Sequence, residues 1–485
     1  MTARSICSRS VVPEAADPAP AGSLAIVLHS HMPYVEGFGT YPFGEEWLFD
    51  AYLRSYAPLL EFARGVTLTI TPVLADQLEA GGVAERLADF GRDLRLNMAL
   101  DEAELVEPEY AAGCRSEAER YRRSLELIAA AGGDLLAPFR DRARGGDIAL
   151  MSSSATHAIL PLIATEAGRR AQIETGMRSH RRRFGEPAGF WLPECAYEPG
   201  IEALLADYGV PGFCVDQSAR TRIGEFTAPL VTAAGPKALA IDWQLVSRLW
   251  ALDGYPSDPL HRDFHRKTHR GARAWSVADR AYEPDAAERR AREQAADLLA
   301  ATAARLRAEA PGGDGVLCFA CDTELLGHWW WEGPAWLDEL IRRAPEFGVE
   351  LVTVPEALAR HPGTEGFEIA TSSWGEGKDL RTWDSRPVAD LAGALRRLEL
   401  HAIGALRRHG PREPERALRV TRELFAAQAS DWAFLDLRRQ AGDYPFERAV
   451  AHAERLHEAI DSALPPDPRV RNLAPDLRPS ALIEP

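Results

Sequence analysis

The sequence predicts an α/β protein built on a closed barrel of parallel strands, and two observations support that fold. Short apolar segments alternate with helical segments from about residue 24 to residue 360, as in repeated strand–helix units. Three apolar segments end in polar side chains, led by His29, Glu194 and Asp322. Because the parallel strands of a barrel bring their carboxyl ends to one face, these side chains are expected to gather there.

The strands are predicted from short apolar segments that are rich in β-branched residues. They are expected at 24–28, 66–71, 148–154, 189–192, 210–215, 316–321 and 349–353. Helices are expected between them at 76–95, 115–131, 169–184, 286–308 and 334–344. Residues 286–308 are almost only Ala, Arg, Glu and Leu, and this composition favours a helix strongly.

The chain changes character near residue 385, where strand patterns stop. Helical periodicity is found at 388–409, 413–429 and 446–463, which predicts a helical domain. The expected division is a disordered tail over 1–22, a catalytic barrel over 23–385, a C-terminal helical domain over 386–464 and a Pro-rich tail over 465–485.

The composition excludes two classes of partner. The 485 residues are 46% hydrophobic and 26% charged, with a net charge of −16, so neither nucleic acid nor an anionic membrane is an expected partner. A neutral polysaccharide would not be repelled. No segment approaches the ~18 apolar residues of a membrane span, and the first 22 residues do not resemble a signal peptide. A cytoplasmic location is therefore expected.

No metal or cofactor is predicted. The six cysteines are scattered, unlike a secreted disulfide scaffold, and Cys318 and Cys321 are expected to be small buried side chains of a strand. His29 and His31 have the spacing of metal ligands, but no third histidine is tied to them locally.

The segment around Asp322 carries the strongest indication of function. Asp322, Thr323 and Glu324 follow a buried strand, and Trp329 to Trp331 come shortly after. Carboxylates can perform acid–base chemistry while aromatic faces cover the apolar faces of sugar rings. The alternative is a strand end capped by solvated acids, with the tryptophans in the core. The tryptophans are expected to divide, one lining the site and the others packed between domains.

Five motifs together resemble glycoside hydrolase family 57, of the α-1,4-glucan branching-enzyme type. They are His29-Ser30-His31-Met32-Pro33, Ser154-Ala155-Thr156-His157, Trp191-Leu192-Pro193-Glu194-Cys195-Ala196-Tyr197, Asp322-Thr323-Glu324-Leu325 with Gly327-His328-Trp329-Trp330, and Ser373-Trp374-Gly375-Glu376-Gly377. Ser430-Asp431-Trp432 resembles the helical C-terminal module of that family. The resemblance covers nearly the whole chain between the two expected tails.

The resemblance implies a (β/α)7 TIM-like barrel with a small helical insertion and a C-terminal all-α domain that closes over the cleft. It also implies a retaining mechanism with Glu194 as nucleophile and Asp322 as acid/base. Retaining sites hold their two carboxyl groups about 5–5.5 Å apart, and the ends of different barrel strands can supply that spacing.

The resemblance further implies a set of residues that bind an α-1,4-glucan, glycogen-like or a maltooligosaccharide. They are His29, His31, His157, Trp250, Gly254, Trp374, Trp383, Asp431 and Gln440. Trp374 and Trp383 would stack on glucose rings, and Gly254 would let sugar approach the backbone. Each histidine alone could instead be structural, and Asp431 could be a buried cap.

The expected activity is that of a 1,4-α-glucan branching enzyme. One departure favours an α-amylase or a 4-α-glucanotransferase as the alternative: the loop at 218–229 is shorter than in family branching enzymes and carries no tyrosine to shield an intermediate from water. Two other classes are a carbohydrate-binding protein without chemistry and a metal-dependent deacetylase that uses His29 and His31. The presence of both Glu194 and Asp322 argues against the binding protein.

Overall fold

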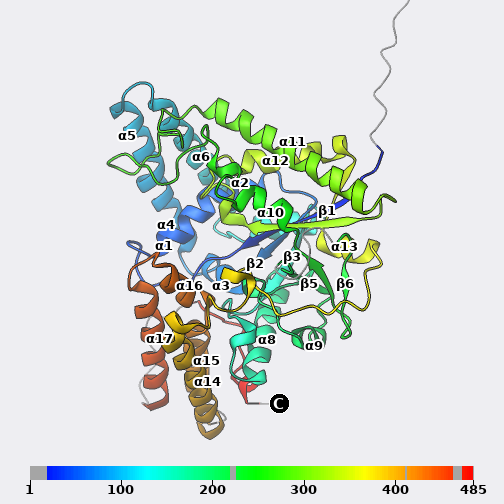
Figure 1. Ribbon diagram of the computed structural model, residues 1–485. Coiled ribbons are helices and arrows are strands. Elements are labelled where there is room, and N and C mark those ends of the chain that lie inside the picture. Colours follow the sequence, from blue (N-terminus) through cyan, green and yellow to red (C-terminus); the bar gives the residue numbers. More distant parts are fainter. Residues whose placement is uncertain (1–18, 219–225, 410–411, 462–471, 484–485) are drawn as a thin grey trace, which may run out of the picture.

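Parallel strands form the centre of the molecule, with helices around them and a helical bundle at one end (Figure 1). The computed structural model describes residues 19–218, 226–409, 412–461 and 472–483. Within these residues, no helix combines the length and the apolar character that crossing a bilayer requires.

Seven parallel strands make the barrel. They are β1 (Gly22–Ser30), β2 (Val66–Ile70), β3 (Ile148–Ser153), β4 (Phe190–Trp191), β5 (Gly212–Val215), β7 (Lys237–Ala240) and β8 (Val316–Asp322). The order is β7-β5-β4-β3-β2-β1-β8. A bridge between Ile241 and Cys318 joins the end of β7 to β8, and the amide of Asp242 donates to the carbonyl of Cys318 at 2.7 Å. These contacts close the circle, and the predicted (β/α)7 fold class is confirmed.

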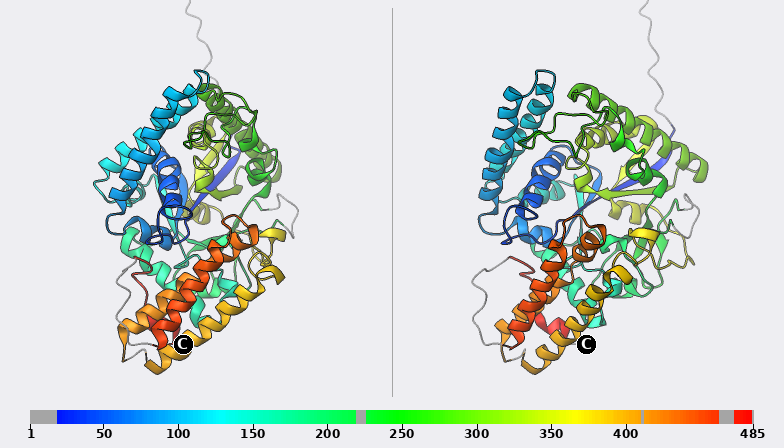
Figure 2. Two further views of the ribbon diagram at one scale, coloured as in Figure 1. Left: turned by 90° about the vertical axis from the view of Figure 1, so that its left-hand side faces the viewer. Right: turned by 60° about the vertical axis from the view of Figure 1, so that its left-hand side comes forward.

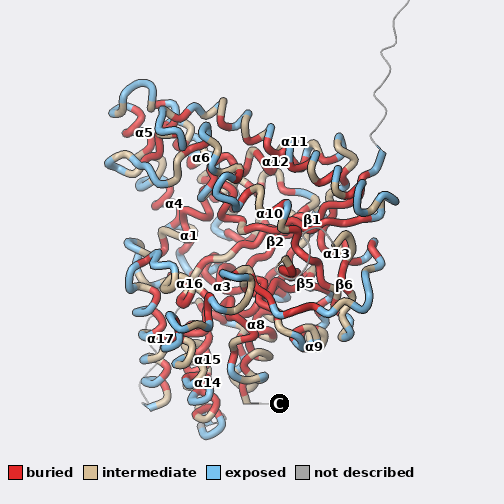
Figure 3. Tube along the Cα trace, viewed as in Figure 1, coloured by how far each residue is buried: buried red, intermediate tan, exposed pale blue. Residues whose placement is uncertain are grey.

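Two short strands lie outside the seven. The strand β6 (Leu230–Val231) runs antiparallel to β7. The strand β9 (Val349–Val352) pairs with the first half of β1, and β2 takes over that edge from Val27 onward. Most strand residues are buried, as Figure 3 shows in red, which explains why uninterrupted apolar segments predicted them.

Helices enclose the barrel. They are α1 (Glu45–Ala51), α2 (Ala57–Leu60), α3 (Pro72–Leu78), α4 (Val83–Gly91), α5 (Asn97–Leu105), α6 (Ala111–Ala130), α7 (Ala137–Arg144), α8 (Glu166–Phe184), α9 (Ile201–Asp207), α10 (Trp243–Trp250), α11 (Pro284–Glu309), α12 (Gly333–Arg343) and α13 (Val354–Arg360). The helices α4 to α6 form an insertion between β2 and β3. The helix expected over 76–95 is interrupted, because Gly82 adopts a left-handed conformation before α4.

The C-terminal helices form a separate bundle beside the barrel (Figure 2). They are α14 (Ala389–His409), α15 (Pro414–Ala427), α16 (Ser430–Arg438) and α17 (Tyr444–Asp461). Leu398, Val420, Leu424 and Leu456 share a buried cluster with Val73 and other barrel residues. The sequence predicted three of these helices but not α16, which is only nine residues long.

The chain end is not the free tail that the sequence predicted from residue 465 onward. Leu473, Leu477 and Leu482 are 2%, 5% and 0% exposed and pack into the cluster that joins the bundle to the barrel. The side chain of Asn472 donates to the carbonyl of Asp76 at 2.6 Å. These leucines bury apolar surface at regular intervals, and this outweighs the effect of the prolines around them. At the other end, β1 already begins at Gly22; residues 1–18 of the expected first tail lie outside the described residues.

Replacing Leu482 by Ala should lower the free energy of unfolding by about 2–5 kcal/mol, because it opens a cavity between the bundle and the barrel. The change is measured by denaturant or thermal unfolding. The control is Leu400→Ala in α14, where the side chain is 57% exposed and little change is expected. Equal stabilities for the two variants would mean that residues 472–483 do not pack as described.

Candidate active site

The barrel brings the polar strand ends together on one face. Glu194 follows β4 and Asp322 ends β8, where it pairs in register with His29 of β1. His31 follows β1 and His157 follows β3. The first expectation, that these side chains gather at the carboxyl ends of the strands, is therefore confirmed by the fold.

The main chain at Glu194 turns sharply away from the strand. Glu194 and Cys195 have φ angles of 56° and 50°, in the left-handed region that costs roughly 1–2 kcal/mol for each non-glycine residue. The carbonyl of Glu194 accepts a hydrogen bond from the amide of Trp374 at 2.7 Å, and Tyr197 forms an antiparallel bridge with Ser372. The segment 372–374 thus holds the turn in its strained conformation.

The three acids of this region differ in accessibility. Glu194 and Asp322 are partly exposed, whereas Glu324 is only 3% exposed. Glu324 accepts hydrogen bonds from the hydroxyl of Tyr56 and from the amide of His31. Glu324 is therefore a buried structural acid, and Glu194 and Asp322 are the carboxyls that a ligand can reach.

Both accessible carboxyls hold their protons more tightly than usual. Although they keep some contact with solvent, burial, followed by the charges of Asp322 and Asp431, raises the pKa of Glu194 to about 8. Burial raises the pKa of Asp322 to about 6, against the opposing charge of His31. Glu194 and Asp322 feel each other's charge, so they titrate as a coupled pair.

Three histidines stack beside the acids. The rings of His31 and His157 are 3.9 Å apart between centroids, and His29 lies between His157 and Trp191. The Nε2 atoms of His29 and His157 are 3.1 Å apart. Burial, with the charge of neighbouring histidine, lowers the pKa of both His29 and His157 well below its usual value, so they are neutral donors and acceptors.

The bundle completes this histidine group. Asp431 in the first turn of α16 lies 3.0 Å from Nε2 of His31. The hydroxyl of Ser430 lies 2.8 Å from Nδ1 of His157. The ring nitrogens of His31 and His157 are thereby engaged by protein groups, and no cluster of three or more His, Cys, Asp or Glu in the described part of the chain is arranged to hold a metal ion.

The two tryptophans expected to stack on glucose rings have different surroundings. Trp374 is partly exposed and meets Trp191 edge to face at 5.0 Å. Trp383 is 3% exposed, packs with Trp432 and Ala196, and donates from Nε1 to the carbonyl of Ser430. Trp383 therefore has no free face for a sugar in this structure, and the expectation that it stacks is corrected to a packing role.

A second aromatic pair is exposed. Trp250 and Trp329 are 42% and 39% exposed, with ring centroids 6.3 Å apart, while Trp330 and Trp331 are buried. The tandem tryptophans thus divide as expected. Gly254 is buried, and a side chain there would approach the carbonyl oxygen of Leu249 to 2.6 Å. The end of α10, and not an approaching sugar, already requires a glycine at this position.

Gln440 lies apart from the other predicted residues. The helix α16 extends about 10 Å from Asp431 to Arg438, and Gln440 follows its far end as an exposed residue. Only the beginning of α16 reaches the acids, so the structure does not bring Gln440 to the site.

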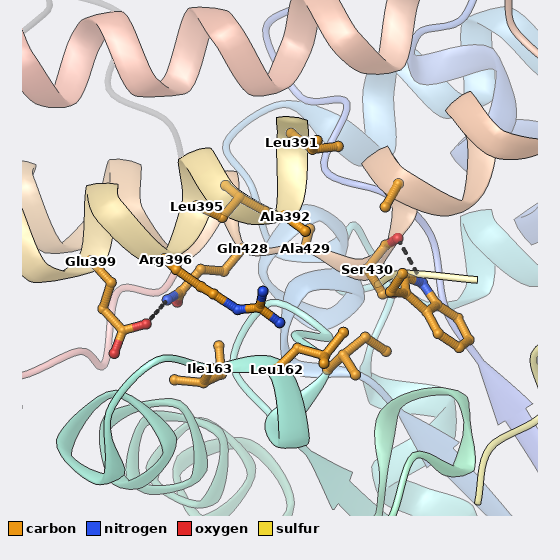
Figure 4. Close-up of a pocket in the computed structure, with 13 residues that line it drawn as sticks. Leu162, Ile163, Leu391, Ala392, Leu395, Arg396, Glu399, Gln428, Ala429 and Ser430 are labelled. Atoms are coloured by element: carbon orange, nitrogen blue, oxygen red, sulfur yellow. Dashed lines mark hydrogen bonds between the residues drawn. The ribbon is translucent and has the colours of Figure 1, made fainter. Parts of the chain in front are cut away.

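A small cavity lies behind the site (Figure 4). It has a volume of about 50 Å³ between α14, α16 and residues 159–163. Its walls are mostly apolar, with Arg396, Glu399 and Gln428 as the polar exceptions. Ser430 borders both regions, but neither Glu194 nor Asp322 lines the cavity, which is therefore separate from the acid pair.

Several residues of the site were not predicted. Tyr56 holds Glu324, and Thr71 lies 3.1 Å from Nδ1 of His31. The ammonium of Lys378 lies 2.7 Å from Asp216 and 3.1 Å from the ring centroid of Trp243. Asp216 directly follows an apolar strand, as Asp322 does, and that pattern could have identified it; Tyr56 lies in a helical segment with no such pattern.

Comparison with known proteins agrees with this geometry. The model of glycosyl hydrolase family 57 matches residues 104–370. The 1,4-alpha-glucan branching enzyme of Thermococcus kodakarensis is 30% identical over 494 residues, which cover 90% of this chain and 73% of that protein.

Two solved structures are similar over most of their length. The GH57-type branching enzyme of Pyrococcus horikoshii has a TM-score of 0.86 and 29% identity over 90% of each chain. The alpha-amylase AmyC of Thermotoga maritima has a TM-score of 0.80 and 27% identity, over 91% of this chain and 93% of that one. The fold and the acid pair define a carbohydrate-active barrel enzyme. The chain belongs to glycosyl hydrolase family 57.

Glu324 should make stability depend on pH. Burial, then the charge of Asp322, raises its pKa to about 8 from an ordinary 4.5, so the folded protein binds this proton more tightly than the unfolded chain does. The contribution of Glu324 to stability is greatest below pH 4.5 and is lost as the pH rises towards 8. Glu324→Gln removes this titration, so its stability relative to the unmodified protein should increase from pH 5 to pH 8.

Thermal unfolding of both proteins at several pH values measures this effect. Glu376→Gln, at an exposed acid on the same face of the barrel, is the matched control. Parallel pH profiles for Glu324→Gln and the unmodified protein would contradict the expectation.

Proposed function

We propose that this protein is a 1,4-α-glucan branching enzyme. The observation that carries the proposal is the pair of accessible carboxyls, Glu194 and Asp322, beside a histidine group that the bundle completes through Ser430 and Asp431. The relative from Thermococcus kodakarensis, which bears that name, aligns with 90% of the chain.

In the first step, Glu194 acts as the nucleophile of a retaining reaction. Its carboxylate oxygen forms a bond to the anomeric carbon while the α-1,4 bond to the leaving oxygen breaks. Asp322 gives its proton to that oxygen, and its raised pKa favours the protonated form that this role needs. The products are a covalent glycosyl-enzyme and a shortened chain with a free 4-hydroxyl.

In the second step, a glucan 6-hydroxyl replaces the enzyme. Asp322 takes the proton of the hydroxyl, the oxygen attacks the anomeric carbon, and Glu194 leaves as carboxylate. The neutral His29 and His157, with His31 and Asp431, would bind sugar hydroxyls around this centre. Trp374 and Trp250 would supply aromatic faces for the rings. No step requires a metal or a cofactor.

The alternative is an enzyme that passes the chain to water or to a 4-hydroxyl. The similarity to alpha-amylase AmyC, with a TM-score of 0.80, favours it, as does the short loop at 218–229. Most of that loop, residues 219–225, lies outside the described residues. Branching and hydrolysis share the first step and differ only in the acceptor.

The finer expectations form part of the same proposal. The barrel over 23–385 would perform the chemistry, and the helical domain over 386–464 would complete the glucan site. The substrate would be a cytoplasmic glycogen-like polymer. The net charge of −16 agrees with a neutral polymer as partner and with the absence of nucleic acid.

Incubation with amylose distinguishes the two activities. A branching enzyme should form α-1,6 linkages, so new reducing ends appear only after treatment with an enzyme that cleaves such linkages. Reducing ends that rise at once, without α-1,6 linkages, would establish the hydrolase alternative. Glu194→Gln should lose about four orders of magnitude or more in rate while it keeps its fold, because the amide cannot form the intermediate. Substantial activity in that variant would refute the assignment of the nucleophile.

Trp374→Ala should weaken glucan binding by about 1 kcal/mol or more, through loss of the aromatic face. The main-chain hydrogen bond to Glu194 remains in this variant, so the change reports on the indole alone. Titration with maltooligosaccharides measures the affinity. Phe446→Ala, which removes an exposed aromatic ring from α17, is the control. An unchanged affinity would exclude Trp374 from the sugar site.

A further inference from the structure

A buried ion pair lies directly behind the turn that carries Glu194. Asp216, at the end of β5, is 0% exposed, and Lys378 is its only cationic partner among the described residues, with Nζ 2.7 Å from Oδ2. The other oxygen of Asp216 accepts hydrogen bonds from the amide and the hydroxyl of Ser218. The same Nζ lies over the ring of Trp243 at 3.1 Å. A cation held by a carboxylate and an aromatic face is fixed in position.

Lys378 closes a compact turn. Its carbonyl accepts from the amide of Ser373 at 3.2 Å, and its own amide donates to the carbonyl of Gly375 at 3.0 Å. Lys378 itself has a φ of 58°, a conformation that favours glycine and that needs support from its surroundings. The turn over 373–378 is therefore held at one end by the side chain of Lys378.

The other end of this turn holds the main chain at Glu194. Trp374 donates to the carbonyl of Glu194, and Ser372 exchanges two hydrogen bonds with Tyr197 at 2.9 and 3.1 Å. The contacts form a continuous path from the ion pair, through the turn, to the strained residue that bears the accessible carboxyl. A shift of the turn would move both Trp374 and the peptide of Glu194.

We propose that Lys378 is a positioning residue for Glu194: its contacts with Asp216 and Trp243 anchor the turn that sets where the Glu194 carboxyl and the Trp374 ring point. This inference rests on the proposed function, because it concerns the reaction in which Glu194 attacks. Lys378 does not touch the reacting atoms; it acts through the main chain of 373–375.

An activated donor, α-maltosyl fluoride, tests the positioning at Glu194 alone. Fluoride leaves without strong help from a proton donor, so its release reports the attack by Glu194 and does not depend on whether water or a glucan is the acceptor. Lys378→Met keeps the length and apolar stem but loses the charge, and kcat for fluoride release should fall by about 100-fold, as for a misplaced catalytic group. KM should change much less. Lys378→Arg, which keeps the charge and its contact with the ring, should recover most of the rate.

Lys237→Met is the matched control. Lys237 is also a partly buried lysine, but it lies at the amino end of β7 and donates to the carbonyl of Leu358 at 2.8 Å. Its loss should leave fluoride release unchanged. Asp216→Asn supplies a second variant: if the two partners act as a unit, the double variant with Lys378→Met should be no slower than Lys378→Met alone.

The outcomes separate the two proposals. Absence of fluoride release by the unmodified protein, or unchanged release by Glu194→Gln, would overturn the proposed function and the inference that rests on it. Normal release by the unmodified protein and an equal kcat for Lys378→Met would overturn the positioning role alone. Should Lys378→Met not fold, Asp216→Asn and Lys378→Arg decide the question: a lower kcat in Asp216→Asn, with an unchanged unfolding temperature, supports the role, and an unchanged kcat opposes it.

Discussion

The closure of the barrel between β7 and β8 is the constraint on which the site depends. In an open sheet, Glu194 on β4 and Asp322 on β8 would be four strand spacings apart, about 19 Å, through β3, β2 and β1. The contacts of Ile241 and Asp242 with Cys318 curl the sheet into a ring. The two strand ends then face each other across one mouth, near enough for the charge of Asp322 to raise the pKa of Glu194.

The site is shared between two parts of the chain. The barrel supplies the acids and the histidine rings, while the bundle supplies Asp431 and Ser430 as partners for His31 and His157. A stack of neutral imidazoles needs such partners, because each buried ring nitrogen without a hydrogen bond costs free energy. The bundle is therefore part of the site and not an appendage to a finished barrel.

Much of this arrangement could be predicted from the sequence, for a physical reason. Strands buried on both sides appear as continuous apolar segments, and the first polar residue after each one marks the functional face; Glu194 and Asp322 were found this way. Packing between distant segments leaves no such pattern. Trp383 and Gly254 have types suited to sugar binding, yet their neighbours in space give them structural roles. Lys378 could not be paired with Asp216, 162 residues away, without the fold.

The buried chain end has a mechanical consequence. Residues 472–483 lie between α8 of the barrel and the bundle: Arg182 of α8 pairs with Asp476, and Arg422 of α15 donates to the carbonyl of Leu473. The bundle is thus anchored to the barrel both where the chain enters it and where the chain leaves it. A hinged lid needs one free side, and this arrangement has none. A long polymer must consequently thread in along the open rim of the barrel, so the architecture suits chains with accessible ends more than densely crosslinked particles.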